Sequence, residues 1–364
     1  MKFNPLKHSI TLLLDFRAHK SDKSHGKVDQ DSTPVRSVMS SIKTPTLEGV
    51  YEARGIISRY LKPTPLLYSR RLSKMLGCQL YLKLENLQPT RAFKVRGGIN
   101  YMQHMQRQTS AKTVITASTG NHAQSIAYAG TLFGIDVKIV MPNGVPQVKI
   151  DAVKELDAEV IIHGSYFDEA LRYSEQLAVD KGYVCVHGIN EILLHEGVAT
   201  MHLEILEEQP KIDAVINPIG GGSGASGACV VYKSLEPRIR IIGVQSEGAA
   251  AFYHSWKEGS ITPAEQITTI AEGLATAQAY DLPFRVLRKW LDDIILVSDD
   301  ELKRAVSTIF LATGQVAELA GAAAIAAAFK VREQLQERNV AVIVSGGNIQ
   351  ANQLSQILLN SPSF

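Results

Sequence analysis

Three segments of the sequence carry residue types that could do chemistry, and the most distinctive of them is rich in glycine. It reads Asn217-Pro-Ile-Gly-Gly-Gly-Ser-Gly-Ala-Ser-Gly227, with five glycines among residues 220–227. Consecutive glycines let backbone N–H groups face a ligand with no side chain in the way, and such groups at a helix start bind phosphate. A tight turn alone would need one or two glycines. The segment therefore predicts phosphate binding, and a weak match to the dinucleotide pattern G-x-G-x-x-G at Gly222, Gly224 and Gly227 leaves the ligand open.

The second segment, Ala117-Ser-Thr-Gly-Asn-His-Ala123, joins an expected strand to an apolar helix. Ser118, Thr119 and Asn121 offer polar side chains, and Gly120 would expose backbone N–H groups where the helix begins. The positive end of a helix dipole favours an anion, so this segment suits a carboxylate. Taken alone, ordinary N-capping by Ser or Asn is the simpler interpretation.

The third segment, Ala92-Phe-Lys-Val-Arg-Gly-Gly98, places Lys94 between two apolar residues at the beginning of an expected helix. A lysine is unfavourable at this end of a helix dipole, and an apolar setting lowers its pKa. Both features suit an amine that forms a Schiff base. A solvated surface lysine is the default alternative for any isolated Lys.

The elements that must position these segments alternate between two hydrophobic periods. Apolar, β-rich runs are separated by stretches with helical spacing, which predicts parallel sheets covered by helices. Ligands in such sheets lie beyond the carboxyl ends of the strands, where all three segments fall. The predicted strands are Gln79–Leu84, Thr113–Ala117, Asp136–Met141, Glu159–His163, Tyr183–His187, Ala214–Ile219, Arg238–Val244 and Val340–Val344.

Length and composition exclude several classes of protein. The 364 residues favour two domains or one large α/β domain, and 45% hydrophobic with 20% charged residues is ordinary for a globular protein. No apolar run approaches the roughly 18 residues that span a bilayer, and a net charge of +2 gives no field suited to nucleic acid. We therefore expect neither a membrane nor a nucleic acid as partner. Three scattered cysteines, Cys78, Cys185 and Cys229, are expected to be buried structural thiols in a reducing cytoplasm.

Residues 1–43 differ from the remainder of the chain. They hold eight Lys or Arg residues and four Asp residues, with a short apolar patch at 10–14. A signal peptide is excluded because Asp15 and Arg17 end the apolar patch and no cleavage site follows, and the acidic residues count against a transit peptide. We expect a flexible N-terminal extension or an upstream start, with Met39 as an alternative initiator.

Together, the three segments supply a lysine for an imine, glycines for a phosphate and a helix start for a carboxylate, which is what pyridoxal phosphate (PLP) and an amino acid require. Their order and wording resemble the serine/threonine dehydratase branch of the fold-type II PLP enzymes, which also includes serine racemase. The resemblance runs from about Leu61 to Gln350. Its pieces are KPTPL (62–66), YLKLENLQPTRAFKVRGG (81–98), ASTGNHAQSIAYA (117–129), NPIGGGSG (217–224), AEGLA (271–275), VAELAGA (316–322) and SGGN (345–348).

The resemblance implies a tryptophan synthase β-like α/β fold of two parallel-sheet lobes with the cofactor between them. Residues 44–112 and 187–364 would form a large PLP-binding lobe, and residues 113–186 a small lobe that closes over the substrate. The resemblance also implies a homodimer or homotetramer, without deciding between the two.

The resemblance further implies a role in cofactor binding for particular residues. Lys94 would form the Schiff base, Phe93 would lie beside the cofactor ring and Asn121 would bond its 3′ oxygen. Ser345 would meet the pyridine nitrogen, and Glu318 is also expected in the cofactor site. A hydroxyl at Ser345 cannot keep the ring protonated as an Asp would, which favours expelling a β-substituent. The phosphate would be held by Gly220, Gly221, Gly222, Ser223 and Gly224.

For the substrate, the resemblance implies a carboxylate pocket lined by Ser118, Thr119, Gly120 and His122. Lys94 would remove the Cα proton, giving β-elimination of L-threonine or L-serine to a 2-oxo acid and ammonia. Thr119 occupies the position of a serine that acts on the opposite face of Cα in racemases, so it is a second catalytic candidate. A racemase, a β-replacement enzyme of the cysteine-synthase type and a dehydratase specific for hydroxyaspartate or phenylserine remain alternatives.

The sequence departs from the family pattern at several positions. Arg91 and Ala92 replace a glycine and a serine, and Arg91 is expected either to pair with a second substrate carboxylate or to face solvent. The usual His-Pro-Phe-Asp reads 187–190 His-Gly-Ile-Asn, and the usual Gln-Gly-Thr is read as 196–198 Glu-Gly-Val. No metal is expected, because Gln245 and Ala251 stand where metal-activated relatives have a Glu and an Asp, which leaves Glu247 as a lone candidate ligand.

Overall fold

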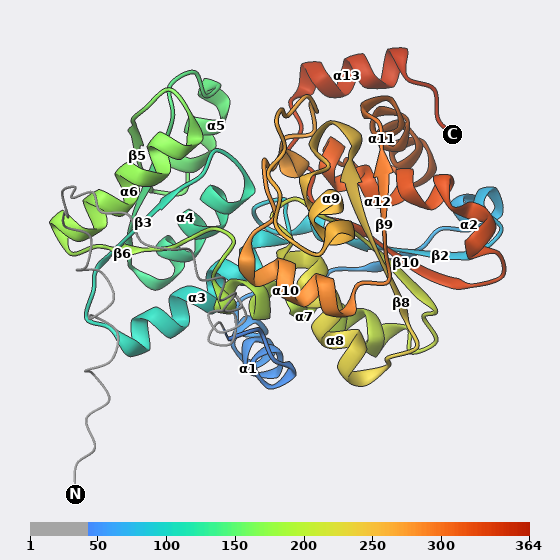
Figure 1. The fold of residues 1–364 in the computed structure, drawn as a ribbon, viewed down its shortest axis with the longest axis horizontal. Coiled ribbons are helices and arrows are strands. Elements are labelled where there is room, and N and C mark those ends of the chain that lie inside the picture. The colour runs from blue at the N-terminus through green and yellow to red at the C-terminus, as the bar shows by residue number, and fades with distance from the viewer. Residues whose placement is uncertain (1–42) are drawn as a thin grey trace, which may run out of the picture. The chain divides into compact units, whose positions relative to one another are not determined.

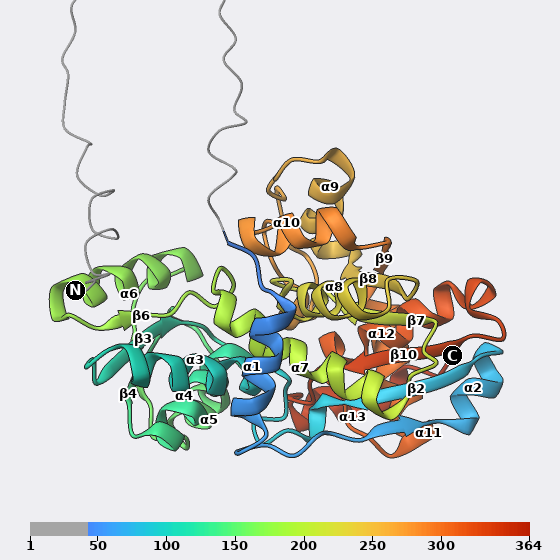
Figure 2. The same ribbon diagram turned by 90° about the horizontal axis from the view of Figure 1, so that it is seen from below.

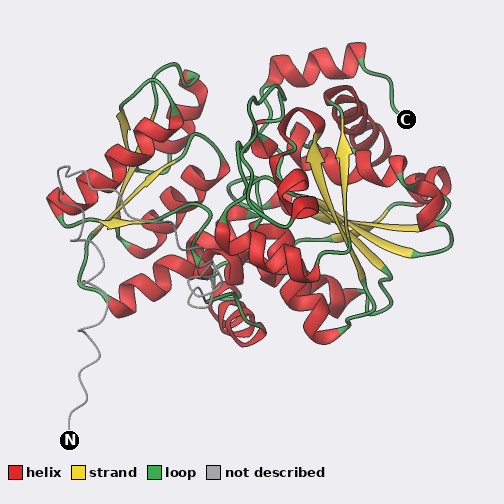
Figure 3. Cartoon of the chain, in the orientation of Figure 1, coloured by secondary structure: helices red, strands yellow, loops and turns green. Residues whose placement is uncertain are grey.

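The computed structural model describes residues 43–364, which form two open sheets covered by helices (Figures 1 and 3). The predicted extension, except for Lys43, lies outside the described residues. Within 43–364 no helix is both long and apolar enough to cross a membrane. The strands are β1 (Leu66–Tyr68), β2 (Gln79–Leu84), β3 (Thr113–Ala117), β4 (Asp136–Met141), β5 (Glu159–Ile162), β6 (Val184–Cys185), β7 (Ala214–Pro218), β8 (Arg240–Ser246), β9 (Asp293–Val297) and β10 (Asn339–Val344).

The helices follow the strands in the alternation that the sequence predicts. The α-helices are α1 (Leu47–Ile57), α2 (Arg70–Leu76), α3 (Lys94–Gln108), α4 (Asn121–Phe133), α5 (Gln147–Lys154), α6 (Phe167–Lys181), α7 (Ile192–Glu208), α8 (Ser223–Leu235), α9 (Ala251–Glu258), α10 (Asp281–Trp290), α11 (Asp299–Thr313), α12 (Leu319–Lys330) and α13 (Ala351–Asn360). Short 3-10 helices are η2 (Glu85–Leu87), η3 (Glu247–Ala249), η4 (Glu272–Leu274) and η5 (Arg332–Leu335).

The two sheets are built almost entirely of parallel strands. The six-stranded sheet has the order β1-β2-β10-β7-β8-β9, in which only β1 is antiparallel to its neighbour. The four-stranded sheet has the order β5-β4-β3-β6 and is parallel throughout. The predicted α/β class with parallel sheets is therefore confirmed. All the predicted strands are present, but β6 covers only Val184–Cys185 of the predicted Tyr183–His187.

Two edge strands, β1 and β9, are absent from the sequence prediction. β1 has three residues, too few to show any period. β9 has five, and its run Ile294-Ile-Leu-Val297 carried a β-branched signal that could have found it.

Helix α12 shows why an alanine-rich stretch can be a core element. Its residues 319–328 are all buried, and they pack in one apolar cluster with β2, β7 and β10. Small side chains let the helix approach the sheet closely, so the alanine run predicts tight packing and not a membrane segment.

Helix α3 contributes to the packing of both sheets. Its apolar residues Val95, Ile99 and Met102 lie in a cluster with residues of β3, β4 and α4, next to the four-stranded sheet. On another side α3 packs directly against α7, and α1 packs against both of these helices; Figure 2 shows the three helices next to one another. The beginning of α3, where Lys94 lies, is therefore held from both sides.

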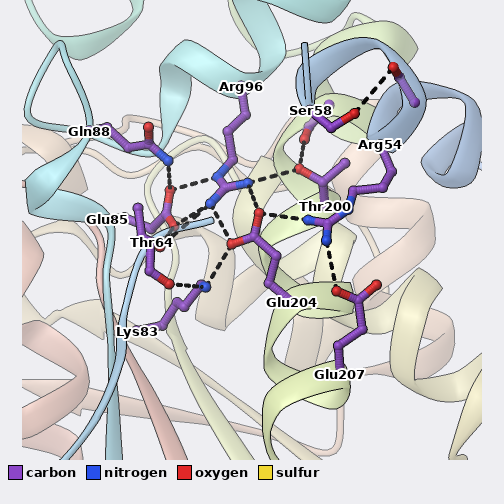
Figure 4. A network of polar contacts seen from close by, with 12 residues as sticks. Arg54, Ser58, Thr64, Lys83, Glu85, Gln88, Arg96, Thr200, Glu204 and Glu207 are labelled. Carbon is purple, nitrogen blue, oxygen red and sulfur yellow. Dashed lines mark hydrogen bonds and ion pairs between the residues drawn. The ribbon is translucent and has the colours of Figure 1, made fainter. Parts of the chain in front are cut away.

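On the side of the six-stranded sheet, α3 is held by the fully buried guanidinium of Arg96, which lies between two carboxylates (Figure 4). Its Nε and Nη2 donate to the oxygens of Glu85 (2.8 and 2.7 Å), and Nη1 and Nη2 donate to those of Glu204 (2.7 and 2.8 Å). Lys83 Nζ lies 2.6 Å from Glu204 Oε2 and donates to the carbonyl of Thr64 at 2.6 Å. Two buried cations thus face two buried carboxylates, and the network joins α3 to β2, η2 and α7.

Burying these charges is tolerable only because each is paired and hydrogen-bonded. Burial by itself raises the pKa of Glu85, but the charge and hydrogen bonds of Arg96, with help from Lys83, outweigh it and lower that pKa to about 2. A carboxyl with a lower pKa in the folded state stabilises the fold above its ordinary pKa, and this contribution is lost as the pH falls toward the folded value.

Replacing Arg96 with Met should lower the free energy of unfolding by about 3–5 kcal/mol at neutral pH, because two carboxylates then stay buried without their cation. The difference from the wild type should shrink as the pH falls from 4.5, the ordinary value for Glu85, toward about 2. Urea unfolding at several pH values measures both effects. Arg59→Met, at an exposed arginine, is the matched control and should change stability by less than about 0.5 kcal/mol. A difference independent of pH would contradict the assignment.

Candidate active site

The three segments identified in the sequence meet at the carboxyl ends of the strands. Lys94 Nζ, at the start of α3, donates to Ser223 Oγ in the glycine-rich segment at 2.9 Å. Asn121 Nδ2, at the start of α4, donates to Glu318 Oε1 at 2.7 Å, while its Oδ1 accepts from Asn348 Nδ2 at 2.7 Å. Elements from both sheets therefore contribute polar groups to one site.

Lys94 is held in a partly buried, mainly apolar position. Its Nζ lies 5.3 Å from the centre of the Phe93 ring, and its carbonyl accepts from Ser125 Oγ at 2.6 Å. The Phe93 N–H donates to the carbonyl of Ser345 at 3.1 Å, which brings the end of β10 next to the lysine. Burial lowers the pKa of Lys94 to about 8, so the amine is partly unprotonated near neutral pH. Lys94 is not a solvated surface lysine.

The glycine-rich segment turns its carbonyls toward the protein and leaves its N–H groups free. The carbonyl of Gly220 accepts from Thr276 Oγ1 (3.3 Å), and that of Gly222 accepts from Ser226 N (2.9 Å). Among the described residues, the N–H groups of 220–222 have no acceptor, and those of 223–225 lie in the first turn of α8, where no intrahelical acceptor exists. This is the arrangement that an anion requires.

At two positions of this segment, Gly220 and Gly222, a residue with a side chain would not fit. A Cβ on Gly220 would lie 2.1 Å from the backbone oxygen of Gly273. Gly222 has a φ of +94°, and a Cβ there would lie 2.7 Å from Pro283. The glycines are therefore explained by close backbone approach and left-handed conformation, which together shape a cradle. The cradle fits a phosphate group.

The segment before α4 divides its side chains between two tasks. Ser118 Oγ accepts from the N–H groups of Gly120 (3.3 Å) and Ala123 (3.2 Å), so for this residue the capping interpretation holds. Asn121 does not cap the helix, because its amide bonds Glu318 and Asn348. The hydroxyl of Thr119 is half-buried and makes no hydrogen bond among the described residues, so it is available to a ligand.

His122 is half-buried and contacts β3 of the four-stranded sheet. Its Nε2 lies 3.2 Å from Thr116 Oγ1, and Gly188 packs against its ring. Burial, with the nearby charge of Lys94, lowers the pKa of His122 to about 3, so the imidazole is neutral. Because Thr116 is a buried residue of β3, its contact with His122 supports the segment before α4.

Glu318 is the carboxyl of the site. Burial raises its pKa to about 7, and the hydrogen bond from Asn121 offsets only part of that effect. Near neutral pH the group can therefore hold or release a proton. Asn348, whose amide bonds Asn121, is a site residue without a predicted role, and its place in the SGGN motif is the local signal that points to it.

An ion pair beside Glu318 was also missed. Lys149 of α5 pairs with Glu272 of η4, which joins an element beside the four-stranded sheet to one beside the six-stranded sheet. Neither residue could have been chosen from its type alone, because lysine and glutamate are common on solvated surfaces.

The family departures have simple structural consequences at several positions. Arg91 has a φ of +53°, a conformation that suits the glycine it replaces, and its side chain is exposed. Glu196 Oε1 accepts from Thr46 N (3.1 Å), away from Lys94. Gln245 Oε1 accepts from Tyr253 N (2.8 Å), and Glu247 pairs with Lys330.

The cysteines do not approach the site contacts described above. Cys78 and Cys229 are buried, as expected, but Cys185 is only half-buried because β6, a two-residue edge strand, leaves it partly uncovered. Burial raises the pKa of all three thiols, that of Cys78 to about 11, which makes them poor nucleophiles.

A buried lysine and a glycine cradle at the ends of parallel strands are the features of an α/β enzyme that uses pyridoxal phosphate. The family described as "Pyridoxal-phosphate dependent enzyme" matches residues 57–346, and this chain belongs to that family. The predicted family resemblance, the enzyme class and the PLP cofactor are thereby confirmed.

The relatives of this chain include ammonia-lyases and a racemase. The chain is 37% identical to an L-threonine ammonia-lyase of Thermotoga maritima, over 86% of this chain and 78% of that protein. It is 35% identical to the catabolic L-threonine dehydratase TdcB of Escherichia coli K12, over 85% of this chain and 95% of that protein. The solved structure of maize serine racemase is 32% identical, covers 87% of this chain and 98% of its own, and superposes with a TM-score of 0.82.

Replacing Gly222 with Ala should weaken PLP binding by about tenfold or more, because left-handed backbone costs a side-chain-bearing residue roughly 1–2 kcal/mol and Pro283 obstructs the new methyl group. Titration of the cofactor-free protein with PLP measures the dissociation constant. Gly55→Ala is the control, since Gly55 lies in α1 with nothing within 4 Å of an added Cβ. Equal PLP affinity in Gly222→Ala and the wild type would contradict the cradle.

Proposed function

We propose that this enzyme removes the hydroxyl and amino groups of a β-hydroxy amino acid, L-threonine or L-serine, yielding a 2-oxo acid and ammonia. The observation that carries the proposal is the hydrogen bond from the Lys94 amine, with its lowered pKa, to Ser223 in the phosphate cradle. The names of the bacterial relatives, threonine ammonia-lyase and threonine dehydratase, support the substrate class.

The residues of the site fit PLP. Lys94 would hold the cofactor covalently, the N–H groups of 220–224 would bind its phosphate, and Phe93 would lie beside its ring. Asn121, Glu318 and Ser345 complete the proposed cofactor site. When bound, PLP supplies an electron sink that weakens the bonds to the substrate Cα.

In the proposed reaction, Lys94 moves the Cα proton. Its amine is partly unprotonated near neutral pH, as a general base must be. Ser118, Thr119 and Gly120 would orient the substrate carboxylate, using the N–H groups at the start of α4. His122 supports this segment from beneath through Thr116. A hydroxyl at Ser345 holds no proton on a pyridine nitrogen as a carboxyl would, which favours loss of the β-substituent.

The surroundings of the reaction are part of the proposal. The lobe of residues 113–186 would close against that of 44–112 and 187–364 and exclude water from the reacting groups. The enzyme would act as a homodimer or homotetramer in the cytoplasm. The three free thiols among the described residues support a reducing compartment.

Replacing Lys94 with Ala should abolish turnover, and borohydride reduction should then leave no pyridoxyl group on the peptide that contains residue 94. Mass spectrometry of the reduced, digested protein reads this directly. Lys62→Ala, at an exposed lysine, should retain both the adduct and full activity. A wild-type adduct on any other lysine would refute the assignment.

A panel of substrates tests the reaction itself. The panel contains L-threonine, L-serine, 3-hydroxyaspartate and phenylserine. Release of 2-oxo acid should be fastest with L-threonine or L-serine. Faster release from 3-hydroxyaspartate would move the proposal to a dicarboxylic substrate, and sulfide-dependent synthesis of cysteine without oxo acid would replace it by β-replacement.

Racemisation is the second candidate, favoured by the free hydroxyl of Thr119 beside the helix start. If the Thr119 hydroxyl exchanges a proton with the opposite face of Cα, Thr119→Ala should lower racemisation of L-serine by about a hundredfold. It should lower β-elimination much less, because the variant keeps the backbone N–H groups that would orient the carboxylate. Chiral chromatography and 2-oxo acid release measure the two reactions in one sample. Equal losses in both would assign Thr119 to carboxylate binding.

A further inference from the structure

A cluster of three buried polar side chains lies directly beneath the glycine-rich segment. His202 of α7, Asn217 at the end of β7 and Tyr232 of α8 are each at most 2% exposed. His202 Nε2 lies 3.1 Å from the carbonyl oxygen of Gly224 and 3.2 Å from Asn217 Nδ2, and its Nδ1 lies 3.2 Å from the Tyr232 hydroxyl. The imidazole therefore connects α7, α8 and the end of β7, where the glycine-rich segment begins.

The contact with the Gly224 carbonyl selects one tautomer. A carbonyl oxygen can only accept, so the ring nitrogen that faces Gly224 must carry the hydrogen. The buried ring is neutral, because burial lowers the pKa of His202 to about 3, and its Nδ1 is then an acceptor. The Tyr232 hydroxyl donates to Nδ1. In this tautomer Nε2 cannot accept from Asn217 Nδ2, so the Asn217 carboxamide must turn its oxygen toward the ring to bond it. With the hydrogen on Nδ1 instead, Nε2 would accept from Asn217 Nδ2 but would face the oxygen of Gly224 with a lone pair.

The bond from His202 determines where a backbone donor points. In a planar trans peptide the C=O and N–H groups point in opposite directions, so a carbonyl of Gly224 held by His202 directs the N–H of Ala225 away from α7. In the first turn of α8 that direction is toward the free N–H groups of the cradle. Among the carbonyls of the segment, that of Gly224 is the one held by a buried side chain of another helix.

The cluster needs an explanation because buried polar groups are costly. Removing an imidazole, a carboxamide and a phenol from water is unfavourable unless each is hydrogen-bonded, and apolar side chains would fill the same space at lower cost. None of these three side chains makes a hydrogen bond to Lys94, Thr119 or Glu318. Through the His202 ring, all three are connected to the Gly224 carbonyl of the glycine-rich segment and to the end of β7.

We propose that His202, oriented by Tyr232, is a positioning residue for the cofactor phosphate: it holds the Gly224 carbonyl so that the N–H groups at the start of α8 stay aimed into the cradle. The inference rests on the proposed function, since the anion concerned is the phosphate of PLP. It goes further by assigning the affinity of the cradle in part to residues outside it.

Two variants of the full-length protein test the positioning role. Tyr232→Phe removes one hydroxyl, and His202→Phe removes all three polar contacts of the imidazole while keeping an aromatic ring. The PLP dissociation constant should rise about threefold to tenfold in Tyr232→Phe and at least about tenfold in His202→Phe. The phosphorus NMR signal of the bound cofactor should shift in both. Thermal unfolding of the cofactor-free proteins separates these effects from general stability.

Tyr81→Phe is the matched control. It also removes a hydrogen-bonded tyrosine hydroxyl, one on β2 that accepts from Gln209 Nε2 (2.7 Å), but this hydroxyl lies away from the cradle. It should bind PLP as the wild type does. Variants of His202 and Tyr232 that lose stability but keep wild-type affinity and phosphorus shift would overturn the proposal. A wild type that binds no PLP at Lys94 would instead overturn the proposed function.

A spectroscopic test needs no variant. Nitrogen NMR of the histidine-labelled holoenzyme should give His202 a protonated Nε2 and an unprotonated Nδ1. The opposite tautomer would mean that the ring accepts from Asn217 and does not donate to Gly224, which would also overturn the proposal.

Discussion

The position of Lys94 depends on the buried ion network around Arg96. Arg96 lies two residues after Lys94 in the same helix, and its guanidinium is held by four hydrogen bonds to Glu85 and Glu204. Because the charges balance within the network, the helix start can be buried between two sheets without an unpaired ion. The planar geometry of the two bidentate pairs also fixes the rotation of α3, and with it the direction of the lysine.

Burial then sets the protonation states at the site. It lowers the pKa of Lys94 to about 8 and of His122 to about 3, and it raises that of Glu318 to about 7. In each case the low-dielectric surroundings favour the neutral form, so the amine and the carboxyl can exchange protons close to neutral pH while the imidazole cannot. Burial thus leaves Lys94 and Glu318 able to gain or lose a proton near neutral pH, whereas His122 stays neutral and has a structural role.

Much of the fold followed from local patterns, and the exceptions have physical causes. The parallel strands of both sheets appear as apolar runs because such strands are covered on both faces. The edge strand β1 escaped prediction because three residues are too few to show a period, whereas β9 carried a β-branched run at 294–297 that was not used. The contact between Asn121, Glu318 and Asn348 joins residues 197 and 227 positions apart, and no local pattern specifies such a meeting. The same holds for His202, whose partners Asn217 and Tyr232 lie on other elements.

The sequence by itself determined the class of chemistry, because the lysine, the glycine-rich segment and the Asn-His helix start are local motifs whose residue types limit what they can bind. It also determined the parallel α/β class through its alternating periods. Only the tertiary structure decided that α3 packs with both sheets, that His122 faces Thr116, and that the Gly224 carbonyl is held by an imidazole of another helix. These outcomes depend on which buried polar groups find partners across the chain, and pairing over such distances is settled by packing.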